Sequence, residues 1–440
     1  MGFNTIERKS YLYGVLKAYL SRAFHMFYKI SVEDKSGVEE GEPIIYAPNH
    51  QNALIDPLVL LFTRKSQIIF FARSDIFKNK IIAKFLYFIK MLPVFRIRDG
   101  YENLHRNQAI FDKTMSVIAS GSGLGIFPEA NHAGYRKLRS LKKGISRVAF
   151  QTELNYNEEL NVKIVPVGIE YEHYYWFRSK VHVNYGKAIS VKDYIEDYKE
   201  NIPNGVNKLN GAIRDSIIPL IVNIQFKGNE YEAVDFLTEI NFNIENSTED
   251  LSFEDRIKHD QKLVENITRF QYLDEDIFSK IIRKTNEYRK LLKEVRTDDY
   301  SVQRVQNKRS CIGIILLLIL TFPLYIIGAL FNYLPYKLVY MSTRNIEDIQ
   351  FHGTMYFTLG ALVSFPVFYL IYFFVLKSIL SVYVALILLV IIGFLGVFSY
   401  DYWRLYIKMK RGMRMKKSSK KQKELFRLRK VLVNFLESLR

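Results

Sequence analysis

The 440-residue sequence contains very little cysteine and tryptophan, with one Cys and two Trp. A single cysteine, Cys311, excludes an intrachain disulfide, a cysteine-rich zinc site and an iron–sulfur cluster. Acidic residues are also scarce, because 63 Lys and Arg face 45 Asp and Glu, for a net charge of +18. The mean hydropathy of −0.04 is too high for a disordered chain and too low for a transporter with many spans. We therefore expect a folded soluble domain joined to a smaller membrane part.

The basic excess is concentrated at the C-terminal end. From Arg404 onward there are 14 Lys and Arg against two Glu, a net charge of +12, which leaves +6 for the preceding residues. A basic tail can bind nucleic acid, but this one directly follows an apolar stretch, where polybasic segments usually meet anionic lipid headgroups. We therefore expect membrane lipid, and no nucleic acid, as its partner.

Long apolar runs are confined to residues 311–334 and 354–399. The second run is about twice the length of one span and has Lys377 near its middle, which predicts two helices joined by a short turn there. The first has Pro323 at its centre, and a third crossing would put the basic tail opposite the basic residues before the run, against the positive-inside tendency. We therefore expect residues 311–334 to form a re-entrant or broken helical hairpin that returns to the cytoplasmic face.

Both ends of the chain have amphipathic helical patterns. Residues 1–9 carry both signs of charge, unlike a cleavable signal peptide, so we expect the N-terminus to stay cytoplasmic. Residues 10–30 have a narrow basic stripe on an apolar surface, which fits an interfacial helix or a helix packed on its own domain. Residues 419–440 repeat leucines at helical spacing after a capping-box pattern, which fits packing on a neighbouring helix or contact with lipid.

The pattern between these ends changes at about residue 204. Residues 41–203 alternate short apolar runs with helical segments, as in an α/β domain whose strands are buried on both faces. The following hundred residues show helical periodicity and few strand signals. We predict five parts: an N-terminal interfacial helix (1–40), an α/β domain (41–203), a helical extension (204–308), membrane-embedded hairpins (309–400) and a basic cytoplasmic tail helix (401–440).

A histidine and an aspartate lie close together after a predicted strand, in APNHQNALIDPL (residues 47–58). The imidazole of His50 can accept a proton, and Asp56 can fix its tautomer and stabilise the imidazolium. The block contains no Cys or Ser nucleophile, so it suits direct attack by a substrate hydroxyl on an activated acyl group. A single His–Asp pair is more often structural, so this interpretation depends on the surrounding motifs.

Three further blocks follow in order: MLPVFRIRDG (91–100), GIFPEANHAGYRKLRSLKKG (125–144) and KIVPVGIEY (163–171). Together with the first block they resemble the glycerophosphate and lysophosphatidic acid acyltransferase family, whose motifs occur in this order with similar gaps. The resemblance covers about residues 41–190. It implies an α/β fold with a central mixed sheet flanked by helices. It also implies acyl transfer from acyl-CoA or acyl carrier protein to a glycerol phosphate acceptor in a ternary complex, without a cofactor or metal.

The resemblance also assigns roles to individual residues. It implies that His50 is the general base and Asp56 its partner. Arg96 takes the position of the arginine in the family's second motif, with Arg98 on the same face of a predicted strand end, and a guanidinium can grip a phosphate bidentately. The other substrate-binding residues it implies are Phe127, Pro128, Glu129, His132, Lys142 and Gly144, with Glu129 binding the glycerol portion or ordering the arginines.

The sequence departs from the family pattern at three points. Five residues rather than four separate His50 from Asp56, so the two can meet only if the segment is a turn or a distorted helical start, with Asn52 as the substitute partner. Ala130 replaces a glycine and is less suited to a positive φ or a close approach. Residues 131–133 (Asn-His-Ala) replace Thr-Arg-Ser, so one expected phosphate-binding arginine is missing.

The leading interpretation is a membrane-associated O-acyltransferase of phospholipid biosynthesis that acylates 1-acyl-sn-glycerol-3-phosphate, with its catalytic domain on the cytoplasmic face. Glycerol-3-phosphate is the alternative acceptor. The three departures also leave open a catalytically inert lipid-binding or membrane-tethering protein with the same fold. A transporter is disfavoured because too few apolar runs remain beside the soluble domain.

Overall fold

The structure is a computed structural model that describes residues 2–94, 106–245, 251–307, 312–417 and 419–440. The chain forms two compact units. The first consists of Met1–Val222 together with Ile346–Thr354, and the second of Asn223–Asn345 together with Met355–Arg440. The first unit therefore extends past the predicted boundary at residue 204 and also takes in a short segment from the C-terminal half.

The first unit is built on a mixed sheet of eight described strands in the order β1-β7-β6-β2-β5-β3-β4, with β8 beside β6. Strand β6 runs antiparallel to β7 and β8, and the other pairs are parallel. This confirms the predicted α/β class with a central mixed sheet. The strands are β1 Tyr28–Asp34, β2 Ile44–Pro48, β3 Ile68–Arg73, β4 Met91–Val94, β5 Gly123–Gly125, β6 Lys163–Tyr171, β7 Ser179–Tyr185 and β8 Ile189–Ser190.

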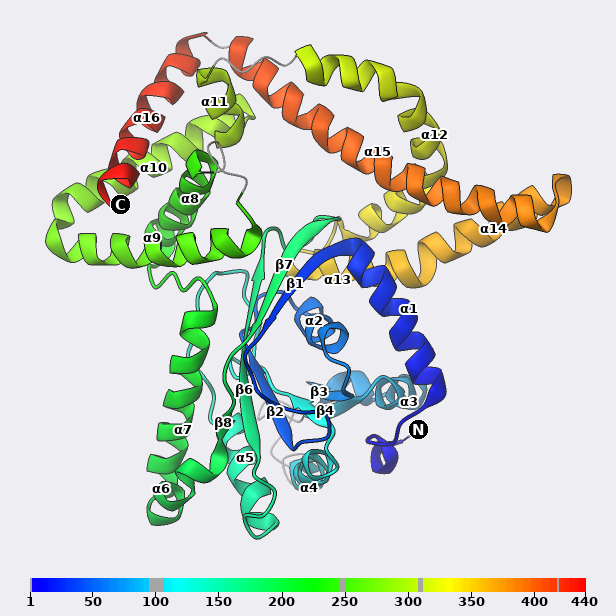
Figure 1. The fold of residues 1–440 in the computed structure, drawn as a ribbon, viewed down its shortest axis with the longest axis vertical. Helices are drawn as coiled ribbons and strands as arrows, with labels where there is room; N and C mark the ends of the chain where they lie inside the picture. Colours follow the sequence, from blue (N-terminus) through cyan, green and yellow to red (C-terminus); the bar gives the residue numbers. More distant parts are fainter. Residues whose placement is uncertain (1, 95–105, 246–250, 308–311, 418) are drawn as a thin grey trace. The chain divides into compact units, whose positions relative to one another are not determined.

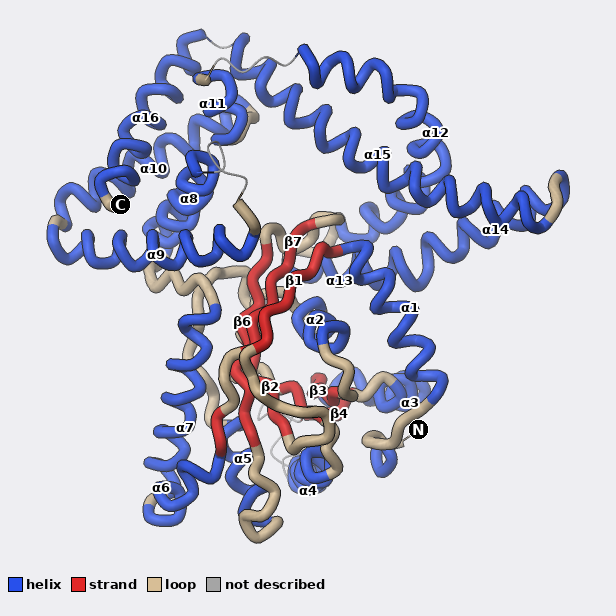
Figure 2. The backbone as a smooth tube through the Cα atoms, in the orientation of Figure 1, coloured by secondary structure: helices blue, strands red, loops and turns tan. Residues whose placement is uncertain are grey.

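Helices flank this sheet, with α2 on one face and α7 on the other (Figures 1 and 2). Strand β2 is buried along its whole length, as expected for a strand covered on both faces. The core joins Ile45 of β2 and Leu124 of β5 to Phe150 of α5 and Ile213 of α7. The helices of this unit are α1 Tyr11–Phe27, α2 Ile55–Thr63, α3 Lys80–Phe88, α4 Arg106–Ala119, α5 Gly144–Asn155, α6 Ile195–Glu200 and α7 Ile202–Ile217.

The sheet begins earlier in the chain than the predicted boundary at residue 41. Strand β1 pairs in parallel with β7, from Tyr28 opposite Ser179 to Asp34 opposite Tyr185. Within β1 only Tyr28 is fully buried, and such a half-exposed edge strand lacks the apolar run that marks a central strand. The preceding helix α1 packs on its own unit through Tyr13 and Phe24. Leu12 and other apolar side chains of α1 are exposed, and their contact with lipid stays a prediction.

All described residues of the second unit that have regular secondary structure are helical. The extension consists of α8 Gly228–Glu245, α9 Phe253–Leu273, α10 Glu275–Val295 and α11 Asp299–Gln306. Three stretches are long and apolar enough to cross a membrane: Ile312–Thr343, Gln350–Ile379 and Val382–Met415. The helices that contain them are α12 Ile312–Thr343, α13 Gln350–Leu359, which a turn of π-helix joins to α14 Phe365–Ile379, and α15 Val382–Lys417; α16 Ser419–Ser438 follows.

The first apolar stretch does not break at its proline. Helix α12 is continuous, with Pro323 and Pro335 both inside it, so the predicted helical hairpin within residues 311–334 is wrong. The helix instead bends along its length (Figure 1), as proline allows by removing a backbone donor. The predicted turn near Lys377 is confirmed, because α14 ends at Ile379 and α15 begins at Val382.

The C-terminal helix α16 packs on the helical extension. The buried guanidinium of Arg429 pairs with Asp299 of α11, Nε to Oδ1 at 2.8 Å, and Lys421 Nζ lies 2.9 Å from Glu294 Oε2 of α10. Of the two interpretations of this helix, packing on a neighbour is therefore confirmed.

Candidate active site

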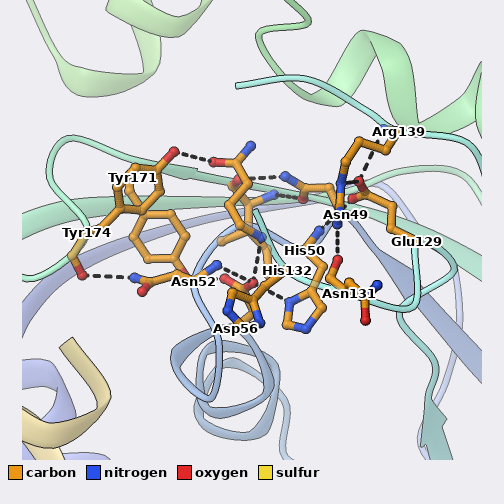
Figure 3. A network of polar contacts seen from close by, with 12 residues as sticks. Asn49, His50, Asn52, Asp56, Glu129, Asn131, His132, Arg139, Tyr171 and Tyr174 are labelled. Atoms are coloured by element: carbon orange, nitrogen blue, oxygen red, sulfur yellow. Dashed lines mark hydrogen bonds and ion pairs between the residues drawn. The ribbon is translucent and has the colours of Figure 1, made fainter. Parts of the chain in front are cut away.

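The first and third sequence blocks lie in loops that follow neighbouring strands. Strand β2 pairs in parallel with β5, and His50 lies two residues beyond the end of β2, as Phe127 does beyond β5. The carboxyl ends of parallel strands meet at one edge of a sheet, which is where open α/β sheets bind ligands. Figure 3 shows the polar network that the two loops form there.

His50 and Asp56 form a hydrogen-bonded pair, with Nδ1 2.7 Å from Oδ2. Asp56 is fully buried at the start of α2, and the same oxygen accepts the backbone N–H groups of Gln51 at 2.8 Å and Asn52 at 2.7 Å. An ionised carboxylate only accepts hydrogen bonds, so Nδ1 carries the ring proton and Nε2 keeps its lone pair. The pair therefore presents the nitrogen that a general base needs.

The backbone of Ala53 accommodates the extra residue between His50 and Asp56. Ala53 has a positive φ of 40°, and the N–H of Ile55 donates to the carbonyl of Asn52 at 2.8 Å, which closes a turn just before α2. Because His50 lies before the helix, the rotation of about 100° per helical residue does not separate the pair. With five residues between them, His50 and Asp56 can meet only if the segment forms a turn or a distorted helical start. The structure has such a turn just before α2.

The side chain of Asn52 has another role than that of a substitute partner. Its amide donates to the carbonyl of Tyr174 at 2.8 Å, and the buried hydroxyl of Tyr28 donates to the same oxygen at 2.5 Å. The side chain of Asn52 thus anchors the His50 loop to the segment that follows β6.

Tyr171, which the sequence did not indicate as a site residue, completes the shell around Asp56. Its hydroxyl donates to Asp56 Oδ1 at 2.5 Å, so both carboxylate oxygens are held. Burial, together with the negative charge of Asp56, raises the pKa of Tyr171 well above its ordinary value, so the phenol stays a donor. The fourth block predicts only a strand, and 115 residues separate the two partners, so no local pattern marks this contact.

Glu129 is buried and joins the two loops. Its Oε1 accepts the backbone N–H of His50 at 2.8 Å, and its Oε2 accepts the Nε–H of Arg139 at 2.7 Å. Arg139, which is not among the predicted site residues, also donates to the carbonyl of Asn131. Glu129 therefore orders Arg139 and holds the backbone of His50, whereas its predicted roles, binding of glycerol or ordering of Arg96 and Arg98, stay predictions.

The backbone around Glu129 brings Phe127 against the histidine. The rings of Phe127 and His50 stack with centroids 4.2 Å apart. Pro128 is buried, and its carbonyl accepts the backbone N–H of Lys142 at 2.7 Å. Ala130 has a φ of +65°, so this loop adopts the left-handed backbone that favours glycine although it carries alanine.

Of the other predicted binding residues, only some are described by the structure, and these differ in how far they are exposed. The ring of His132 lies edge-on to that of His50, with centroids 5.6 Å apart. Lys142 and Gly144 are exposed, just before α5 and at its start. Arg96 and Arg98 lie outside the described residues, so a phosphate site there stays a prediction. Within the described ranges, no group of three or more His, Cys, Asp or Glu side chains is arranged to hold a metal ion.

Residues 29–170 match the family model for Acyltransferase. The chain is 31% identical over 90 residues to glycerol-3-phosphate O-acyltransferase 1 of Saccharomyces cerevisiae, and 28% identical over 130 residues to glycerol-3-phosphate O-acyltransferase 2 of the same yeast. These alignments cover 20% and 29% of this chain, but only 12% and 17% of the two relatives. This chain thus spans only a small part of the length of either yeast protein.

A solved structure is also similar, the 1-acyl-sn-glycerophosphate acyltransferase of Thermotoga maritima. The superposition has a TM-score of 0.33 and 16% sequence identity, and covers 47% of this chain and 79% of that one.

Proposed function

We propose that this chain, whose residues 29–170 form an acyltransferase domain similar to those of glycerophosphate acyltransferases, transfers a fatty acyl group from acyl-CoA or acyl carrier protein to the hydroxyl of 1-acyl-sn-glycerol-3-phosphate. The observation that carries the proposal is the His50–Asp56 pair at the carboxyl edge of the sheet. Its geometry suits removal of a proton from a hydroxyl, and a thioester is an acyl donor that such a hydroxyl can attack.

The proposed reaction proceeds in one ternary complex. As the acceptor hydroxyl attacks the thioester carbonyl, His50 Nε2 takes its proton, and the ionised Asp56 stabilises the imidazolium. Four hydrogen bonds hold that carboxylate, so little reorganisation accompanies the change in charge. The tetrahedral intermediate then expels the thiolate, which receives the proton from the imidazolium and leaves as a free thiol. No acyl-enzyme forms.

The acceptor phosphate is assigned by resemblance to Arg96, with Arg98 beside it. Loss of a charge-assisted contact on substitution of Arg96 by alanine would raise the KM for the acceptor on the scale of about 1.5 to 3 kcal/mol. His132 takes the sequence position at which the resemblance expects an arginine that this chain lacks, and it lies beside His50. The remaining substrate-binding residues of the proposal are the motif residues Phe127, Pro128, Glu129, Lys142 and Gly144.

A membrane location suits a lipid acceptor and a lipid product. Three apolar stretches are long enough to span a bilayer, and basic residues crowd the end of α15 and the segment that follows. We infer that these segments hold the enzyme in the membrane with its catalytic domain on the cytoplasmic face and basic side chains on anionic headgroups. The continuous helix α12 is long and apolar enough for a full crossing.

Glycerol-3-phosphate is the second candidate acceptor, because the two yeast relatives are named for it. An inert lipid-binding protein is the third possibility. It is disfavoured because the unusual spacing still produces a formed His–Asp pair with a complete hydrogen-bond shell.

The test is acyl transfer by the purified full chain in phospholipid vesicles. Each donor, acyl-CoA or acyl carrier protein, is paired with each acceptor, and both thiol release and lipid product are measured. Phosphatidate made from 1-acyl-sn-glycerol-3-phosphate supports the proposal, and a clear preference for glycerol-3-phosphate supports the second candidate. Background rates in every combination would contradict an enzyme function.

A further inference from the structure

A short segment between two apolar helices belongs to the first unit. Residues Ile346–Thr354 follow the end of α12 and include the first turn of α13, yet they are part of the unit that contains the candidate active site. We name this segment the connector. It lies outside the four motif blocks, and 216 residues separate its Asp348 from His132.

The connector contacts the loop that carries His132. Asp348 Oδ2 accepts the Nε2–H of His132 at 2.9 Å, and the ring of Phe351 lies edge-on to the imidazole with centroids 5.2 Å apart. His132 in turn lies edge-on to His50. A continuous series of side-chain contacts therefore runs from the connector to the candidate general base.

A second contact seats the connector on the wall of the site. A Cβ added at Gly353 would come within 2.8 Å of the Tyr174 carbonyl oxygen and 3.2 Å of the Tyr28 hydroxyl. That carbonyl also accepts the amide N–H of Asn52, which anchors the His50 loop. Only a glycine allows this approach without a shift of backbone, so the connector is fitted to this surface at both of its ends.

The presence of a histidine at position 132 explains what the contact with Asp348 can do chemically. By the resemblance, His132 takes a position where the acyltransferase family often has an arginine, and a guanidinium presents several donors without assistance. An imidazole has only two nitrogens, and its orientation is fixed when one of them is held by a partner. Asp348 holds the Nε2–H, and in the imidazolium the remaining Nδ1–H is the donor that a phosphate oxygen can accept.

We propose that the connector completes the acceptor side of the active site, with Asp348 as a positioning residue that holds the His132 ring, as the imidazolium, with Nδ1–H toward the acceptor phosphate. The inference rests on the proposed function. It makes the acceptor site depend on a segment from between the apolar helices, so the catalytic domain is incomplete without the membrane region of the chain.

Asp348 also has a structural role that the test must separate. Its Oδ1 accepts the backbone N–H of Gln350 at 3.1 Å, at the start of α13. Asparagine caps a helix about as well as aspartate, so Asp348→Asn keeps this cap while it removes the charge beside His132. The neighbouring Glu347 is exposed and provides a matched control, Glu347→Gln, with the same loss of charge.

The experiment measures acceptor and donor KM for the full chain in vesicles. Asp348→Asn is expected to raise the acceptor KM about threefold to tenfold, the difference between a charged and a neutral hydrogen bond, with donor KM and melting temperature unchanged. In a His132→Ala background the same substitution is expected to have no further effect. An unchanged acceptor KM, or the same rise in the His132→Ala background, would overturn the proposal.

A second variant tests the seat of the connector. Gly353→Ala is expected to raise the acceptor KM in the same direction, whereas Gly313→Ala, at a position with nothing within 4 Å of an added Cβ, is expected to match the wild type. A wild-type KM for Gly353→Ala would also count against the proposal. An inactive wild type contradicts the proposed function itself, whereas an active wild type with unaltered variants contradicts only the role of the connector.

Discussion

Two His–Asp pairs of the described residues lie near one edge of the sheet, and they differ in nearly every physical respect. His50 and Asp56 are six residues apart, and the carboxylate is fully buried with four hydrogen bonds. His132 and Asp348 are 216 residues apart, and their side chains are 24% and 41% exposed. Asp56 is shielded from water, whereas water screens the second pair.

This difference indicates separate tasks. A buried, fully hydrogen-bonded carboxylate is preorganised to stabilise a charge that develops on its partner, which is what proton transfer requires. A half-exposed carboxylate gives up to about 1 kcal/mol in an ion pair, enough to orient a ring but too little for a large change in barrier. The inner pair therefore fits catalysis, and the outer pair fits binding.

The largest expected effect comes from the inner pair. Asp56→Asn should lower kcat about 10²- to 10⁴-fold, because the amide keeps the shape but cannot stabilise an imidazolium. Steady-state kinetics with a saturating acceptor measure it, and Asp348→Asn is the matched control in the outer pair. Equal losses of kcat in the two variants would remove the distinction between the pairs.

The next largest effect is a loss of stability on substitution of Glu129, a buried carboxylate that pairs with Arg139 rather than with an imidazole. Glu129→Gln leaves Arg139 without its charged partner and weakens the acceptor for the His50 N–H. Removal of one partner of a buried ion pair costs about 3 to 5 kcal/mol, and the 29% exposure of the Arg139 side chain reduces this to about 2 kcal/mol of unfolding free energy. Thermal unfolding of the purified chain measures the loss, and an unchanged melting temperature would show that the loops do not depend on this pair.

Tyr171→Phe tests how much the hydrogen bond to Asp56 Oδ1 contributes to the inner pair. The substitution removes the donor to Asp56 Oδ1 and leaves that buried oxygen unsatisfied, which costs about 1 to 2 kcal/mol and should lower kcat about tenfold. Tyr174→Phe, whose hydroxyl donates to Gln51 rather than to Asp56, is the control. If both variants retain wild-type kcat, Tyr171 does not tune the pair.

The smallest effect lies in the loop of the outer pair. Ala130 has a left-handed backbone, so Ala130→Gly should stabilise the fold by about 0.5 to 1 kcal/mol, seen as a higher melting temperature. The control is Ala83→Gly within α3, where glycine is expected to destabilise by a similar amount. A lower melting temperature for Ala130→Gly would mean that the backbone there is not strained.

The sequence predicts the inner pair well, because its members belong to one short block that directly follows the apolar run of β2. It does not predict the outer pair or Tyr171, since partners 216 and 115 residues apart share no local pattern. The edge strand β1 escapes because it buries few of its side chains. The continuity of α12 escapes because proline within an apolar helix bends the helix rather than ending it.

The most direct test of the account is the rate of acyl transfer by His50→Gln in vesicles, with thiol release and lipid product followed together. If His50 is the general base, kcat falls about 10²- to 10⁴-fold while the donor KM and the melting temperature stay at their wild-type values. A wild-type kcat in this variant would show that another group takes the proton, and would contradict the assignment of the active site.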